Sequence, residues 1–107
     1  MRIPRQFLIK GKRWTVRRTK DLKDENEEPC SGLTDVTNRV IELDKSLTGD
    51  DLEWVFWHEY GHAFLYEAGV TGNTGGLSDL AEEIVCDNFA DVMTTDKTVK
   101  FKRGRRK

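Results

Sequence analysis

The sequence has few cysteines, few histidines and no long apolar run. Its apolar stretches fall well short of the roughly 20 residues that a membrane-spanning helix needs, and the N-terminal segment MRIPRQFLIKGKR lacks the core of a secretory signal. Two cysteines, Cys30 and Cys86, are too few for a disulfide framework, so we expect two free thiols. These absences predict a soluble, cytoplasmic protein with no membrane partner.

The net charge of −1 conceals a strong segregation of charge along the chain. Residues 1–23 hold nine basic residues and one Asp, and residues 97–107 hold seven basic residues. Between them, residues 24–96 hold 18 acidic residues against Arg39 and Lys45, so the middle of the chain favours a bound cation. We expect residues 97–107 to be a flexible tail, for which contact with nucleic acid is an open alternative.

Local patterns predict a single α+β domain over residues 1–96. Residues 6–18 place two β-type runs around Lys10-Gly11-Lys12, as in a β-hairpin, and the charged segment 20–30 should be a solvated loop. Further strands are expected at 32–35 and 39–43, with a turn at 36–38. We expect one small antiparallel sheet, in which 39–43 is either an edge strand or an internal one.

Two helices should follow the strands. Thr48-Gly-Asp-Asp51 resembles a capping box, and the segment after it runs without a breaker to Gly69, which predicts a helix of about 18 residues. Residues 69–77 contain four Gly and should form a loop, and Ser78 or Asp79 can cap a second helix that ends near residue 94.

The first of these helices contains the sequence His58-Glu59-Tyr60-Gly61-His62, which matches the pattern HExxH. The i, i+4 spacing turns both imidazoles to one side of the helix, so they can share one Zn²⁺. Glu59 lies about 100° away around the helix and can take a proton from the water that the metal activates. These are the only two histidines in the sequence, which favours a metal site over a chance match.

The third ligand must therefore be a carboxylate or Cys86. The apolar arc of the second helix contains Glu82, so periodicity favours Glu82. Glu83 has Asp87 four residues later, and a helix with Glu-x-x-x-Asp can supply both a ligand and a carboxylate that orients a zinc-bound His. We prefer Glu83 as the ligand, with Asp87 in contact with a His, and keep Glu82 as the alternative.

Two stretches, LEWVFWHEYGHAFLYEAG and EIVCDNFAD, resemble the ImmA/IrrE family of zinc metallopeptidases. The second stretch is similar to the family pattern E-x-x-A-(N/D)-x-F-A, with Cys86 at the Ala position, and this alignment puts the third ligand on Glu83. The family's apolar continuation is missing, so the chain resembles a minimal, phage-like member. The resemblance implies a zincin-like fold, in which the sheet packs on the HExxH helix and the second helix carries the third ligand.

These features together predict a zinc-dependent endopeptidase with Glu59 as the catalytic base. The resemblance implies a protein substrate of the helix-turn-helix repressor class. One alternative is a catalytically silent binding protein whose zinc site is closed by Cys86, and another is a DNA-associated protease of the SprT type. Candidates for the group that stabilises the oxyanion are four residues: Tyr60, Tyr66, Arg39 and Lys45.

Overall fold

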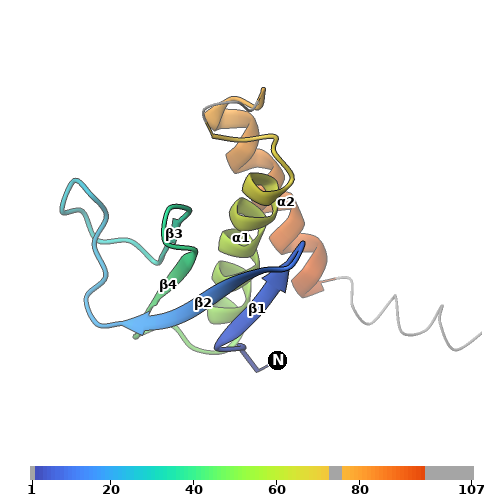
Figure 1. Cartoon of the computed structure of the whole chain (residues 1–107). Coiled ribbons are helices and arrows are strands. Elements are labelled where there is room, and N and C mark those ends of the chain that lie inside the picture. Colours follow the sequence, from blue (N-terminus) through green and yellow to red (C-terminus); the bar gives the residue numbers. More distant parts are fainter. Residues whose placement is uncertain (1, 73–75, 96–107) are drawn as a thin grey trace, which may run out of the picture.

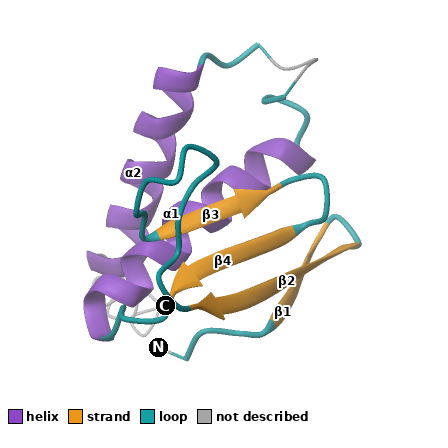
Figure 2. Cartoon of the chain, turned by 90° about the vertical axis from the view of Figure 1, so that its left-hand side faces the viewer, coloured by secondary structure: helices purple, strands orange, loops and turns teal. Residues whose placement is uncertain are grey.

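The computed structural model describes residues 2–72 and 76–95, which form a four-stranded sheet and two helices. The strands are β1 (Gln6–Ile9), β2 (Lys12–Thr19), β3 (Gly32–Asp35) and β4 (Val40–Asp44), and the helices are α1 (Gly49–Glu67) and α2 (Asp79–Thr95). In Figures 1 and 2, α1 lies between the sheet and α2, and the two helices run in opposite directions. The α+β class and both helices are as predicted, and the predicted tail at 97–107 lies outside the described residues.

The sheet is mixed, so the prediction of a purely antiparallel sheet was wrong. The strand order is β1-β2-β4-β3, with antiparallel pairing in β1/β2 and β3/β4 and parallel pairing between β2 and β4. After β2 the chain crosses through residues 20–31, forms β3 at the far edge, and turns back so that β4 fills the gap. Because β4 returns beside β2 only after this crossing, the two strands run in the same direction.

The strand β4 is internal, and β3 is an edge strand. Val40, Ile41 and Leu43 of β4 are buried, as expected for a strand paired on both sides. Of the two positions considered for residues 39–43, the internal one is therefore correct. The free edge of the sheet beside the helices belongs to β3, which packs on α1.

The hydrophobic core lies between the sheet and α1. Trp14 of β2 and Phe56 of α1 are fully buried in it, together with Ile41 and Leu43. The indole nitrogen of Trp14 donates a hydrogen bond of 2.9 Å to Glu67 at the end of α1. This core fixes the face of α1 that points to the sheet and leaves another face for α2.

A polar contact at Glu67, the last residue of α1, lies at one end of the core. Arg39 Nε donates a 2.6 Å hydrogen bond to Glu67 Oε2, the same oxygen that accepts from Trp14. The hydrogen bond from Arg39, assisted by the one from Trp14, holds the pKa of Glu67 below its usual range. The charged form of Glu67 is thus the form that ties α1 to the sheet.

The helix ends follow the sequence signals in part. Thr48 occupies the N-cap position of α1, but its side chain makes no capping hydrogen bond, so the predicted capping box was wrong. Ser78 does cap α2, because its hydroxyl accepts a 3.1 Å hydrogen bond from the backbone N–H of Ala81.

No helix among residues 2–72 and 76–95 is long and apolar enough to cross a membrane. Both Cys30 and Cys86 are free thiols, as predicted.

Candidate metal centre

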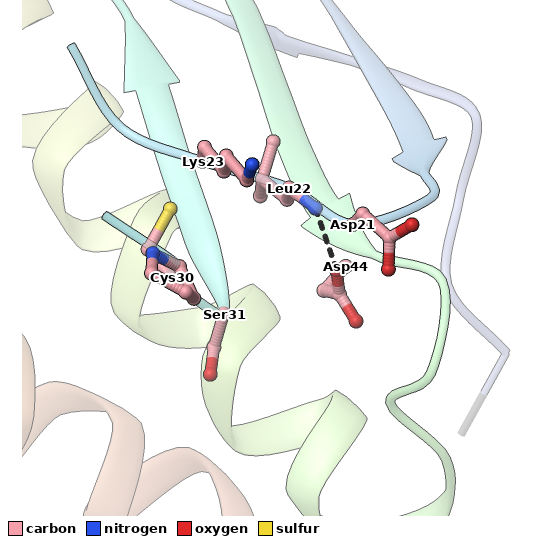
Figure 3. Close-up of a pocket in the computed structure, with 7 residues that line it drawn as sticks. Asp21, Leu22, Lys23, Cys30, Ser31 and Asp44 are labelled. Carbon is pink, nitrogen blue, oxygen red and sulfur yellow. Dashed lines mark hydrogen bonds between the residues drawn. The ribbon is translucent and has the colours of Figure 1, made fainter. Parts of the chain in front are cut away.

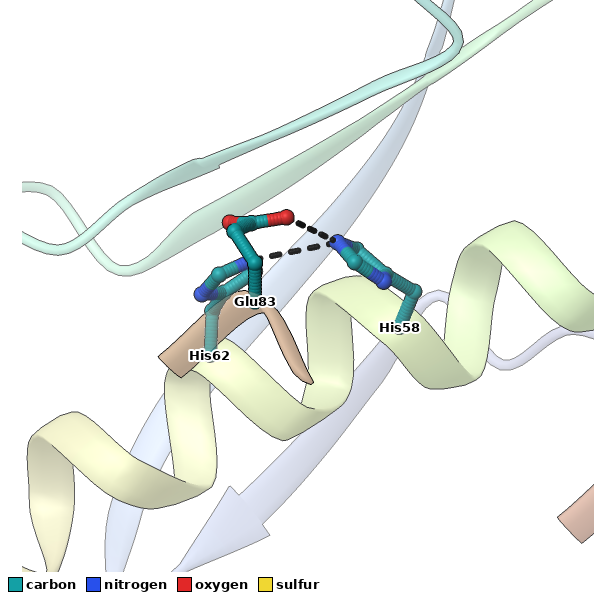
Figure 4. A group of neighbouring side chains, drawn as sticks. All are labelled: His58, His62 and Glu83. Carbon is teal, nitrogen blue, oxygen red and sulfur yellow. Dashed lines mark hydrogen bonds and ion pairs between the residues drawn. The ribbon is translucent and has the colours of Figure 1, made fainter. Parts of the chain in front are cut away.

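The two histidines of α1 and Glu83 of α2 form one compact group. His58, His62 and Glu83 each offer a ligand atom, and these atoms lie within 4.8 Å of one another. Within the part of the chain that the structure describes, this is the one group of three or more His, Cys, Asp or Glu residues placed to hold a metal ion. Figure 4 shows Glu83 lying over α1, with its carboxylate toward both imidazole rings.

The distances in this group fit a zinc site. The Nε2 atoms of His58 and His62 are 3.2 Å apart, and the two oxygens of Glu83 lie 3.3 Å from His58 Nε2 and 3.0 Å from His62 Nε2. Tetrahedral ligands at the usual zinc distances of about 2.0 to 2.2 Å are separated by roughly 3.3 to 3.6 Å. Each oxygen of Glu83 lies near a different imidazole nitrogen, and one ligand atom from each of the three residues falls within 4.8 Å of the others, so a small adjustment of the side chains would let them share a zinc ion.

A carboxylate of α2 lies on the far side of each imidazole ring. His62 Nδ1 lies 2.5 Å from Glu82 Oε2, and His58 Nδ1 lies 2.9 Å from Asp87 Oδ1. A carboxylate accepts hydrogen bonds, so the contact with Glu82 favours a His62 ring that carries its proton on Nδ1 and a lone pair on Nε2. The Nε2 atoms of the two rings lie 3.2 Å apart, so a metal ion beside both could accept a lone pair from each.

The contact between His58 and Asp87 is incompletely formed. His58 Nδ1 is buried and has no hydrogen-bond partner among the described residues, because Asp87 Oδ1, although 2.9 Å away, is off the line of the N–H bond. The Asp87 side chain is 52% exposed and free to turn. A small rotation of its carboxylate would align the bond.

Glu59 lies in the same pocket but outside the ligand group. It lines a hollow of about 370 Å³ together with the two histidines, Glu82, Glu83 and four residues of the sheet side: Gly32, Leu33, Thr34 and Val36. The Thr34 hydroxyl donates a 2.7 Å hydrogen bond to Glu59 Oε1. Burial raises the pKa of Glu59, while the bond from Thr34 opposes that rise.

Two glycines make room for this arrangement. A Cβ on Gly61 of α1 would lie 3.1 Å from the Cys86 sulfur of α2, so Gly61 allows the helices to approach closely at the site. A Cβ on Gly32 of β3 would lie 2.8 Å from Val55 Cγ1 and 2.9 Å from Glu59 Cγ, so Gly32 makes space for both side chains. A larger side chain at either position would displace the groups around the pocket.

Cys86 stands apart from the ligand group. It is fully buried against Gly61, and burial, with nearby carboxylates, raises the pKa of its thiol to about 12. It is not among the residues whose ligand atoms come together. Cys86 thus serves the packing of α2 on α1.

None of the four residues considered as oxyanion stabilisers lines this pocket. Tyr60 packs among aromatic rings, with its ring centroid 4.9 Å from that of Phe7, and Arg39 is hydrogen-bonded to Glu67.

The sequence gives no indication of the role of Thr34, because its hydrogen bond to Glu59 spans 25 residues of sequence and leaves no local signal. The contact of Glu82 with His62 Nδ1 joins two different helices and leaves no local signal either, so Glu82 was considered only as a ligand.

A second hollow of about 460 Å³ lies away from this group, between the 20–31 connection and the end of β4 (Figure 3). Leu22 N donates a 2.8 Å hydrogen bond to Asp44 Oδ1 there and fixes the connection to the sheet. Burial and nearby acidic groups raise the pKa of the Cys30 thiol in this hollow. The thiol is therefore neutral and unreactive at physiological pH.

No family model, no curated protein and no solved structure matches this chain.

Proposed function

We propose that the protein is a zinc-dependent endopeptidase of the ImmA/IrrE type with a zincin-like fold. One observation carries the proposal: His58, His62 and Glu83 come together at zinc-ligand spacing beside the buried carboxylate of Glu59. In this proposal the two histidines and Glu83 hold the ion, and Asp87 and Glu82 orient the histidines.

When bound, a zinc ion supplies a Lewis acid that polarises the peptide carbonyl and makes water acidic enough to react near neutral pH. Glu59 accepts a proton from the attacking water and passes it to the leaving amine. Thr34 holds one oxygen of Glu59 and leaves the other oxygen free for this exchange.

The substrate is expected to bind along β3. This strand is an edge of the sheet, and its residues Gly32, Leu33 and Thr34 line the pocket that contains Glu59. An extended peptide that adds to β3 through backbone hydrogen bonds would pass the histidines. The proposed substrate is therefore an extended linker or loop of another protein, and the resemblance to ImmA/IrrE proteins favours a helix-turn-helix repressor. Free thiols at Cys30 and Cys86 accord with a cytoplasmic setting.

The alternative of a silent zinc-stabilised binding protein depended on Cys86 closing the site. Cys86 lies outside the ligand group and packs against Gly61. Glu83, in contrast, is 55% exposed, so the group opens toward solvent. An open site favours catalysis over a purely structural role. The alternative of a DNA-associated protease depends on residues 97–107, which lie outside the described part of the chain.

The test is to compare the wild-type protein with Glu59→Gln and His58→Ala. Glu59→Gln should retain one zinc per chain and lose proteolysis, because Glu59 handles protons and is not a ligand. His58→Ala should lose both, and Glu28→Gln, a matched change at an exposed position, should lose neither. Zinc content is measured by elemental analysis, and proteolysis by fragments that appear in host-cell extract. Loss of zinc from Glu59→Gln with the fold intact would refute the assigned role.

The substrate class has a separate test. The zinc-loaded protein is mixed with the repressor encoded beside its own gene, and one discrete cut is expected. Because residues 24–96 are strongly acidic and a DNA-binding repressor is basic, the rate of cutting should fall as salt is added. An intact repressor alongside cleavage of an unrelated protein would refute the substrate class and leave the peptidase assignment standing.

A further inference from the structure

The two helices meet through a pair of matching rows of side chains. On α1 the row is Trp54, His58 and His62, and on α2 it is Glu83, Asp87 and Asp91, each with a spacing of four residues. Since the helices are antiparallel, the first residue of one row meets the last of the other. His62 faces Glu83, His58 faces Glu83 and Asp87, and Trp54 faces Asp91.

We infer that Trp54, held in place by Asp91, is a positioning residue for His58. This inference rests on the metal site of the proposed function, because positioning His58 matters only if His58 is a ligand. The indole of Trp54 stacks on the imidazole of His58, with ring centroids 5.2 Å apart and 23° between the planes. On its other side, Trp54 Nε1 donates a 2.8 Å hydrogen bond to Asp91 Oδ1.

The contacts of Trp54 differ from those of a core residue. The aromatic residues of α1 that pack on the sheet are Phe56, Trp57, Tyr60 and Tyr66, and Trp54 is outside that cluster. Its ring contact is with His58, and its polar atom is bonded to an exposed carboxylate. Trp54 therefore belongs to the interface between α1 and α2 and not to the core.

His58 needs such support more than His62 does. The Nδ1 of His62 is 2.5 Å from Glu82, which alone fixes the plane of that ring. The Nδ1 of His58 has only the misaligned contact with Asp87. A flat indole against the imidazole restricts rotation about the Cβ–Cγ bond, so the His58 lone pair is already directed at the shared point before the ion arrives.

Asp91 sets where that indole lies. A tryptophan on a helix surface can adopt several rotamers, and the hydrogen bond from Nε1 to a residue of the opposite helix selects one of them. The same bond fixes the register between α1 and α2, which places Asp87 and Glu83 opposite His58. Asp91 thus acts on the metal ligand through Trp54 and touches neither the ion nor the substrate.

The experiment uses Co²⁺ as the probe, added to the metal-free full-length chain, because its visible absorption reports both the affinity and the geometry of the site. Asp91→Ala should weaken Co²⁺ binding by about tenfold, the lower end of the usual effect of residues that orient metal ligands, and should shift the absorption bands. Asp91→Asn keeps an oxygen acceptor for the indole and should restore both. Trp54→Phe keeps a ring but removes the donor, so it should match Asp91→Ala, and the double variant should lose no more.

Trp57→Phe is the matched control, because Trp57 lies on the same helix and its ring packs against Phe56, Tyr60 and Phe89. It should change the stability of the fold but not the Co²⁺ bands. Unchanged affinity and bands in Asp91→Ala, with wild-type protein binding Co²⁺, would overturn the inference and leave the proposed function intact. Asp91→Asn behaving like Asp91→Ala would show an effect of charge and would also overturn it. Failure of the wild-type protein to bind Co²⁺ would overturn the metal site itself.

Discussion

Removing the three carboxylates of α2 one at a time should separate the ligand from the residues that orient the histidines. The variants are Glu83→Ala, Glu82→Ala and Asp87→Ala. Glu83 presents one oxygen to each His Nε2, at 3.0 and 3.3 Å, so its removal deletes a ligand. Glu82 and Asp87 contact only the Nδ1 atoms, so their removal leaves all three ligands in place.

The expected magnitudes follow from these contacts. Loss of a carboxylate that orients a ligand weakens metal binding by about 10- to 100-fold, or roughly 1.4 to 2.7 kcal/mol. Glu82 should lie near the upper end, since it is 2.5 Å from its ring and its side chain is only 20% exposed. Asp87, at 2.9 Å, misaligned and 52% exposed, should lie near the lower end. Glu83→Ala should exceed both, with a loss of more than about 100-fold.

The assay is a competition titration of zinc between the metal-free protein and a chelating dye, with far-UV circular dichroism to confirm that each variant folds. Glu28→Ala removes an exposed carboxylate far along the sequence from α2 and serves as the control. A larger loss for Glu82→Ala than for Glu83→Ala would refute the assignment of Glu83 and make Glu82 the ligand. Equal, small losses for all three would refute the metal site.

Three further predictions concern the surroundings of the site. Gly61→Ala gains about 1 kcal/mol of helix propensity. It also places a Cβ 3.1 Å from the Cys86 sulfur, and such overpacking costs about 1 to 3 kcal/mol. Denaturant titration should therefore show a net loss of stability. Gly32→Ala pushes on the Glu59 side chain and should lower the rate of proteolysis while zinc stays bound. The folded-state pKa of Glu67 is lowered, so its contribution to stability is present above the unfolded pKa of about 4.3 and is lost as pH falls through the folded pKa. Glu67→Gln should therefore flatten the acid side of the stability profile.

Each of these has an outcome that would count against it. Gly76→Ala, where an added Cβ meets nothing within 4 Å, is the control for Gly61→Ala, and equal stability of the two variants would contradict the close approach of the helices. Loss of zinc from Gly32→Ala would show that the substitution disturbs the metal ligands and does not act on Glu59 alone. An acid transition with the same slope in Glu67→Gln and wild type would show that the contacts of Glu67 with Arg39 and Trp14 add no stability.

Local signals in the sequence predicted the elements well. The hairpin around Gly11, the end of α1 before Gly69 and the cap at Ser78 each depend on a few neighbouring residues, and the structure confirms them. The parallel pairing of β2 with β4 was missed, because it depends on the path of residues 20–31 across the sheet. The residue pattern of a strand does not indicate which other strand will pair with it.

The sequence predicts which residues of the candidate site share a face of one helix. It does not predict how the second helix packs on the first. The spacing of His58 and His62 indicates a shared face by itself. The choice between Glu82 and Glu83 could not be made from a wheel of α2, because both carboxylates point toward α1 and each meets a different atom of the histidines. The contact of Trp54 with Asp91 was hidden in the same way, although the spacing of four residues in each row is visible in the sequence.

The dependence of the site on helix placement leads to a last prediction, about the metal-free protein. α2 packs almost entirely on α1, and its fully buried side chains are only Cys86 and Ala90, so apolar burial holds it weakly. The rest of the contact is the packing of Phe89 against Trp57 and Tyr60, and the row of carboxylates facing the histidines. Zinc that binds only when α2 is in place stabilises that arrangement by mass action. Hydrogen exchange of α2 amides should therefore slow on adding zinc, while the amides of β2 and β4 keep their rates. Equal protection of α2 with and without zinc would mean that the helix pair is fixed by packing alone.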